Sequence, residues 1–243
     1  MVLEAAFWGF IGASALVIAA EVAFAFKLSK MVIGLIMAFG VGALISSISF
    51  ELVVPALQSA GTLRVSLGLL VGALTFFIGD LLIDRLGGSG RKSADGPDEG
   101  SSGLGIVLGT ILDGIPESAV LGMSLATGDG VSVALLAAIW VSNFPEALGA
   151  TVGLQKSGTS KRNIRLMWWG IVLVSAIAAG IGYAVVSNSS GMTGAFVQAF
   201  AAGALLTMIA DEMAPEAFSR SAKYAGLATT LGFILAVFLA TLE

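Results

Sequence analysis

Long apolar runs that follow one another along almost the whole chain constrain its fold more than any other feature of the sequence. Each run is long enough to cross a bilayer as a helix, which takes roughly 20 residues. The eight runs are 2–26, 31–57, 63–83, 104–126, 131–154, 166–187, 192–217 and 224–242. Of the 243 residues, 57% are hydrophobic and only 12% are charged, unlike a soluble domain. We therefore predict an all-α integral membrane protein, a single domain over residues 1–243 with eight transmembrane helices.

The distribution of basic residues predicts how these helices are oriented. Eleven of the twelve Lys and Arg residues fall at one side of the predicted membrane, and only Arg64 falls at the other. Because cytoplasmic loops accumulate Lys and Arg, both termini are expected outside a cell membrane. The longest connection, 87–103, is made of glycine, serine and charged residues and is predicted to be a flexible cytoplasmic loop. Trp168 and Trp169 are expected to anchor the inner interface.

An internal repeat relates the second and seventh runs. Residues 38–51 and 199–212 are identical at seven of fourteen positions without a gap. The two runs cross the membrane in opposite directions, so the repeat is inverted, as in many transporters whose site lies at the repeat interface. This predicts a 3+2+3 arrangement, with helices 1–3 and 6–8 around helices 4 and 5. Glu51 and Glu212 are equivalent in the repeat, and with Asp211 they are candidate gate or vestibule residues.

Carboxylates in the middle of two apolar runs are the strongest functional signal. Asp113 and Glu117 are four residues apart, so they share one face of a helix, and Glu146 occupies the next run. A charge at this depth is costly and is usually functional. Pro116 and Pro145 each leave a carbonyl oxygen without its usual helical partner. With no cysteine and no histidine in the chain, any metal site must use oxygen. The candidate metal ligands are Asp113, Glu117, Ser142, Asn143 and Glu146.

These segments resemble the ZIP (Zrt/Irt-like) family of divalent-metal transporters, of which the chain looks like a histidine-free, divergent member. The resemblance rests on three short motifs: Asp113-Gly-Ile-Pro-Glu-Ser118, Ser142-Asn-Phe-Pro-Glu146 and Asp211-Glu-Met-Ala-Pro-Glu216. Glu117 and Glu146 match the family pattern, whereas Asp113 and Ser142 stand where that family has histidine or glutamine. The resemblance implies eight helices and transport of zinc, iron or manganese into the cytoplasm by alternating access. An oxygen-only site shifts the expected preference away from zinc.

Other classes of protein stay open at this stage. A passive divalent-cation channel or a metal sensor would use the same cation site, and the sequence does not separate these from a carrier. An intramembrane enzyme is less favoured: Phe77-Ile-Gly-Asp80 lacks the first glycine of an intramembrane aspartyl protease motif, and without histidine no serine–histidine dyad exists. We expect no enzymatic activity, no cofactor and no nucleic-acid partner. The expected partners are divalent cations and the lipid bilayer, and a homodimer is left open.

Overall fold

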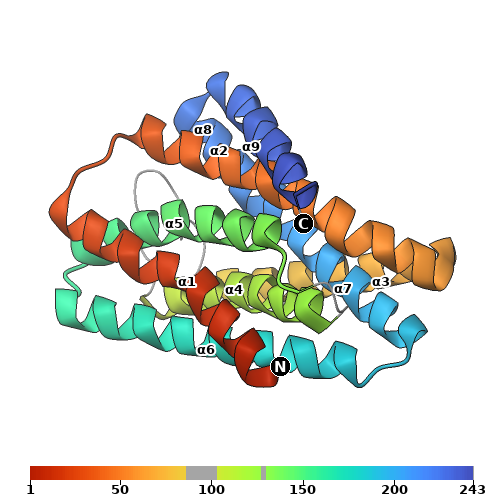
Figure 1. Cartoon of the computed structure of the whole chain (residues 1–243). Helices are drawn as coiled ribbons and strands as arrows, with labels where there is room; N and C mark the ends of the chain where they lie inside the picture. The colour runs from red at the N-terminus through yellow and green to blue at the C-terminus, as the bar shows by residue number, and fades with distance from the viewer. Residues whose placement is uncertain (86–102, 127–129, 243) are drawn as a thin grey trace.

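The computed structural model describes residues 1–85, 103–126 and 130–242, and these residues form helices without a strand (Figure 1). The elements are α1 (Val2–Ala25), α2 (Lys30–Ser47), η1 (Ile48–Val53), α3 (Val54–Ile83), α4 (Gly103–Ala126), α5 (Val133–Lys156), α6 (Lys161–Ser187), α7 (Gly191–Met208), η3 (Ile209–Met213), α8 (Ala214–Ser221) and α9 (Tyr224–Ala240). The predicted loop at 87–103 lies outside the described residues, apart from Gly103 at the start of α4.

Five helical stretches in the described part of the chain are long and apolar enough to cross a membrane. They are Val2–Ala25, Lys30–Ile83, Val133–Lys156, Lys161–Ser187 and Gly191–Ser221. The last helix, Tyr224–Ala240, is apolar but shorter. Large apolar side chains such as Leu67, Leu74 and Phe77 of α3 and Leu231 of α9 are exposed, as expected of a surface in contact with lipid. The chain is a multi-pass membrane protein, whereas the count of eight spans stays a prediction.

A single glycine interrupts the longest of these stretches. Gly61 lies inside α3 with φ 73° and ψ 167°, a conformation that only glycine adopts readily, and a kink separates the helix before it from the helix after it. Figure 1 shows the chain turning back at this right-hand end of the bundle. The predicted connection between the second and third runs, 58–62, contains this break.

Two short π-helical segments, which the sequence did not lead us to expect, occupy equivalent places in the repeat. Segment η1 follows α2 and segment η3 follows α7, and each is succeeded by a helix that begins with a proline, Pro55 or Pro215. A proline ring cannot donate a backbone hydrogen bond and crowds the carbonyl group four residues earlier. A wider π turn accommodates the ring without ending the helix. Glu51 and Glu212 both lie on these π turns.

Glycines bring the backbones of the repeat helices into direct contact. A Cβ atom added at any of four positions would collide with a carbonyl oxygen of the neighbouring helix. The collisions would pair Gly42 with Thr229, Gly232 with Phe39, Gly203 with Leu69, and Gly72 with Phe200. The α2–α9 contact and the α3–α7 contact are thus built alike, because Gly42 and Gly203, like Phe39 and Phe200, are equivalent in the repeat. Such close approach is typical of helix packing in membranes.

The prediction for the adjacent tryptophans was half right. Trp168 is completely buried, and its Nε1 donates a hydrogen bond of 2.9 Å to Oγ1 of Thr151 on α5. Trp169 is 45% exposed and can contact lipid. Consecutive helical residues point about 100° apart, so only one of the pair can face outward while the other packs inside.

Candidate functional site

A direct contact between α4 and α5 joins two of the predicted ligands. Oγ of Ser142 lies 3.0 Å from Oε1 of Glu117, to which it donates a hydrogen bond, and 2.9 Å from the carbonyl oxygen of Ile139. Ser142 is completely buried and Glu117 is 1% exposed. A carboxylate so deep in an apolar helix bundle needs polar partners, and this hydroxyl supplies one of them.

The other two carboxylates lie one helical turn away from this contact. Helices α4 and α5 run in opposite directions, so the turn that precedes Glu117 on α4 is level with the turn that follows Ser142 on α5 (Figure 1). Asp113 and Glu146 occupy these two turns, about 6 Å along each axis. Both are buried, with 2% and 6% exposure. By helical turn, the oxygen-bearing residues thus fall into two layers, one with the Glu117–Ser142 contact and one with Asp113 and Glu146.

Close packing of two further helices fixes the position of these layers. Gly40 of α2 lies against the backbone of Ser142, because a Cβ there would come within 3.2 Å of the Ser142 Cα atom. On the other side, a Cβ at Gly114 would lie 3.5 Å from Oγ of Ser175 on α6. Ser175 is itself buried at 2% exposure. The two carboxylate-bearing helices are thus held between α2 and α6.

The described residues hold no preformed acidic metal cluster. No three of their His, Cys, Asp or Glu side chains form a group that could hold an ion as they stand. Two of the predicted ligands, the carboxylate of Glu117 and the hydroxyl of Ser142, are linked directly by a hydrogen bond. Asn143, next to Ser142 on α5, is also buried, at 5% exposure. A cation bound by these helices would take neutral oxygens as well as carboxylates.

Comparison with known proteins places the chain among transporters. No family model matches it. It is 30% identical over 206 residues to the zinc transporter GufA of Myxococcus xanthus, and the match covers 79% of each chain. The chain belongs to the zinc-transporter family of GufA. It is also 27% identical over 176 residues to a proposed zinc transporter of Arabidopsis thaliana. That match covers 71% of this chain but only 28% of the longer Arabidopsis protein.

In this GufA-family chain the remaining predicted residues lie apart from the α4–α5 contact. Glu51 and Glu212 are half-buried residues on the π turns η1 and η3, and Asp211 is exposed beside Glu212. Both carboxylate oxygens of Glu51 are buried. Glu51 comes eleven residues after Gly40, which packs on Ser142, so it lies about 16 Å further along the helix axis. Glu51 is therefore not part of the two oxygen layers.

Ser175 is the residue near the site that the sequence did not single out. A serine within an apolar run gives no signal, because serine is common at membrane helix contacts. The only clue was its partner Gly114, which stands where the ZIP pattern has an asparagine. The structure shows that the missing side chain at 114 leaves room beside the Ser175 hydroxyl.

Proposed function

We propose that the protein is a ZIP-like transporter that moves divalent cations of the zinc, iron and manganese class across the cell membrane into the cytoplasm by alternating access. The observation that carries the proposal is the buried contact between Glu117 and Ser142, with Asp113 and Glu146 on the adjacent turns. Both relatives are named as zinc transporters, one of them only as a proposed one. Those names also agree with the expectation that the chain is not an enzyme.

The chemistry of the donor atoms suits a divalent cation. Carboxylate, hydroxyl and amide oxygens bind manganese well, and zinc and ferrous iron also accept carboxylates. Since the chain has no histidine or cysteine, neither imidazole nor thiolate competes for the ion. An ion entering between α4 and α5 would draw the carboxylates of Asp113 and Glu146 toward the Glu117–Ser142 pair. This gathering of ligands couples ion binding to helix movement, which is what a carrier requires.

The proposed topology has eight spans and both termini outside. The break at Gly61 supports two spans within residues 30–83, and the shorter α9 supplies the eighth. The basic residues of the α1–α2 and α5–α6 connections lie at the same end of the bundle, on the left in Figure 1, which supports that end as cytoplasmic. The equivalent π turns and glycine contacts support an inverted repeat around α4 and α5.

Replacement of the two matched glutamates tests the site. We expect Glu117→Gln and Glu146→Gln to weaken binding of Zn²⁺ and Mn²⁺ by about tenfold or more, since each removes an anionic ligand while keeping its shape. Calorimetry on the purified protein measures this, and the control is Glu4→Gln, which neutralises an exposed glutamate at the start of α1. Binding equal to the parent protein in both variants would exclude these residues as ligands.

Flux measurements separate a carrier from a channel, the second candidate left by the sequence. In proteoliposomes a carrier shows saturable uptake that is accelerated by the same ion on the far side, because the return step is then loaded. We expect this trans-acceleration in the parent protein and in Glu4→Gln. Flux that rises linearly with concentration would favour the channel, even if the binding results held.

A further inference from the structure

A groove of about 480 Å³ runs between α2 and α9 on the surface that faces lipid. It lies between the first half of α2, from Met31 to Phe39, and the first half of α9, from Tyr224 to Leu231. Met31 and Phe39 are eight residues apart, so the groove follows α2 for about 12 Å. Leu227 and Leu231 at its rim are 68% and 60% exposed. The groove therefore opens outward and not into the helix bundle.

The chemistry of the lining suits an acyl chain. Of the described residues that line the groove, Tyr224 alone has a polar side-chain group, its phenol. Water would find no hydrogen-bond partners along most of this wall, so the groove is not a site for ordered water. In a multi-pass membrane protein, an apolar surface that opens outward meets the acyl chains of the bilayer. The groove volume also lies in the range of sites for small organic ligands, roughly 300–1,000 Å³.

A lysine marks one end of the groove. Lys223 immediately precedes Tyr224, and its Nζ atom lies 5.5 Å from the centre of the Tyr224 ring. The lysine is exposed, and the face of an aromatic ring attracts an ammonium group without neutralising its charge. Tyrosine is enriched where the bilayer meets water, so this end is suited to the level of the lipid head groups. A lipid whose anionic head group contacts Lys223 could place an acyl chain in the groove.

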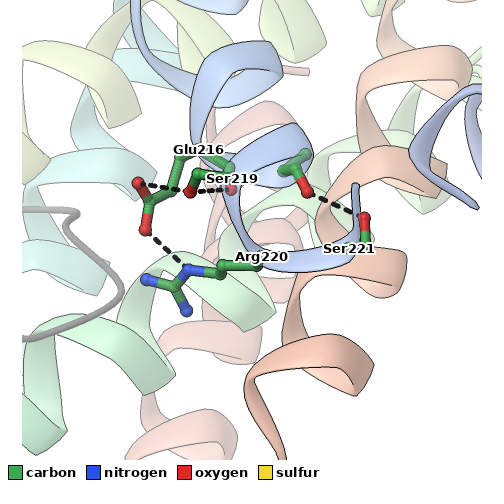
Figure 2. A network of polar contacts seen from close by, with 5 residues as sticks. Glu216, Ser219, Arg220 and Ser221 are labelled. Atoms are coloured by element: carbon green, nitrogen blue, oxygen red, sulfur yellow. Dashed lines mark hydrogen bonds and ion pairs between the residues drawn. The ribbon is translucent and has the colours of Figure 1, made fainter. Parts of the chain in front are cut away.

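Helix α8 fixes the position of this lysine relative to α2. A Cβ atom added at Gly34 of α2 would collide with the Cβ atom of Arg220, so α8 lies directly against α2. The Nε atom of Arg220 donates a hydrogen bond of 2.6 Å to Oε1 of Glu216, one turn earlier (Figure 2). The chain then turns at Ala222, whose φ of 48° lies in the left-handed region, and Lys223 follows as the N-cap of α9. Lys223 therefore belongs to a packed turn between two helices.

The groove also adjoins the part of α2 that makes its closest backbone contacts. Phe39 lines the groove, and a Cβ atom added at Gly232 of α9 would collide with the carbonyl oxygen of Phe39. The next residue, Gly40, packs on the backbone of Ser142. A chain lying in the groove would contact both α2 and α9 and add van der Waals contacts to this pair of helices.

We propose that the groove binds one anionic phospholipid of the surrounding membrane, with an acyl chain packed along Phe39 and Leu231 and the phosphate beside Lys223. The ligand is a lipid and not a soluble anion, because the groove offers one charge and a long apolar wall. Bound there, the lipid stabilises the contact between α2 and α9. This inference does not depend on the transport proposal, because it requires only that the chain lies in a membrane.

A fluorescent label at the rim of the groove tests which lipid lies there. The full-length variant Leu231→Cys is labelled with bimane, which reacts only at this position because the chain has no native cysteine. The matched control is Ile177→Cys on α6, a residue 62% exposed and outside the groove. Each protein is reconstituted in phosphatidylcholine containing increasing brominated phosphatidylglycerol or brominated phosphatidylcholine, whose bromine atoms quench bimane on contact.

We expect brominated phosphatidylglycerol to half-quench the groove label at about one-fifth of the mole fraction that brominated phosphatidylcholine requires, the gain usual for one lysine at a membrane surface. The control label should be quenched equally by both lipids. Equal quenching of the groove label by both would overturn the proposal. A groove label quenched by neither lipid, in a protein that sediments as a dimer, would assign the groove to a second copy of the chain and would also overturn it.

Matched charge variants show whether Lys223 accounts for the preference. In the groove-labelled protein, Lys223→Gln removes an exposed charge and should abolish the preference for phosphatidylglycerol. Arg162→Gln removes an exposed charge at the start of α6, away from the groove, and should leave the preference unchanged. A preference that survives Lys223→Gln, or one that both variants reduce equally, would show general attraction to the basic end of the protein and would overturn the proposal.

Discussion

Glu117 and Ser142 make the most informative single contact in the protein. Their hydrogen bond crosses from α4 to α5 at 3.0 Å, and both side chains are almost completely buried. A hydrogen bond to a charged group contributes more than a neutral one, since the carboxylate would otherwise lie desolvated without that donor. The same hydroxyl can offer its oxygen lone pairs to a cation. One serine thus holds the Glu117 carboxylate and, under our proposal, also offers an oxygen ligand to the bound ion.

We predict that Ser142→Ala lowers the free energy of unfolding by about 1.5–3 kcal/mol, the usual contribution of a hydrogen bond to a charged group. The matched control is Ser221→Ala, which also removes a buried serine hydroxyl but one bonded only to the carbonyl oxygen of Ala217. Unfolding of the purified protein in denaturant measures both. A double-mutant cycle with Glu117→Gln isolates the coupling between the two side chains. Additive effects in that cycle would show that the contact contributes no stability.

At the scale of the helices, glycine decides which surfaces meet. Gly42 on α2 and Gly203 on α7 lie against backbone carbonyl groups of α9 and α3, where no side chain fits. Other glycines, such as Gly170 and Gly226, have open space around them. The sequence does not distinguish a packed glycine from one with open space around it; the packing in the structure does. Close backbone approach of this kind is typical of helix pairs in membranes.

We predict that Gly42→Ala and Gly203→Ala each destabilise the protein by about 1–3 kcal/mol, because the added methyl group forces a helix pair apart. Gly170→Ala and Gly226→Ala should be neutral or slightly stabilising, since the new Cβ meets nothing and alanine favours the helix. Thermal unfolding in detergent compares the four variants directly. The two members of the first pair should also change transport similarly, because they are equivalent in the repeat. Equal stability in all four variants would contradict the packing that the structure shows.

At the scale of the whole molecule, the two ends of the bundle differ in charge. The end that includes the α1–α2 and α5–α6 connections is basic. At the opposite end, which includes Gly61 and the α6–α7 connection, Arg64 is the one Lys or Arg among the described residues. This asymmetry sets the proposed orientation in the membrane.

The orientation predicts opposite labelling of two exposed connections. In intact cells a membrane-impermeant thiol reagent should label Asn188→Cys, after α6, and should reach Ser157→Cys, after α5, only once the membrane is opened. The chain has no native cysteine, so every signal belongs to the introduced residue. The reverse pattern would place the termini in the cytoplasm and would refute the proposed direction of each helix.

The repeat predicts separate kinetic roles for Glu51 and Glu212, which lie on equivalent π turns. Because the carboxylate oxygens of Glu51 are buried in this structure, its role in the outer vestibule requires that helix movement exposes them. We expect Glu51→Gln to slow ion entry from outside and Glu212→Gln to slow release inside, with little change in affinity at the central site, because a vestibule charge attracts the ion without holding it. Proteoliposome flux, measured with binding on the same variants, tests this. Equal losses of flux and binding would show that these acids are ligands of the ion. Normal flux in both variants would show that the acids are structural.

Short-range patterns in the sequence determined the helices and the chemistry of the site. Apolar runs predicted the helical elements because a bilayer leaves the backbone no partner but itself. The i, i+4 spacing placed Asp113 with Glu117 on one face, and both are buried. The missing histidine and cysteine restricted the site to oxygen. Each of these inferences depends on neighbours within one or two turns, which the sequence displays directly.

Only the tertiary structure decided which of these groups meet. That Ser142 bonds to Glu117, while Asp113 and Glu146 stay one turn away, depends on the register between α4 and α5, which Gly40 and α2 help to set. The groove between α2 and α9 joins residues up to 200 positions apart (from 31 to 231). No periodicity encodes such contacts, because helix packing depends on the shape of whole surfaces and many registers satisfy the same apolar pattern.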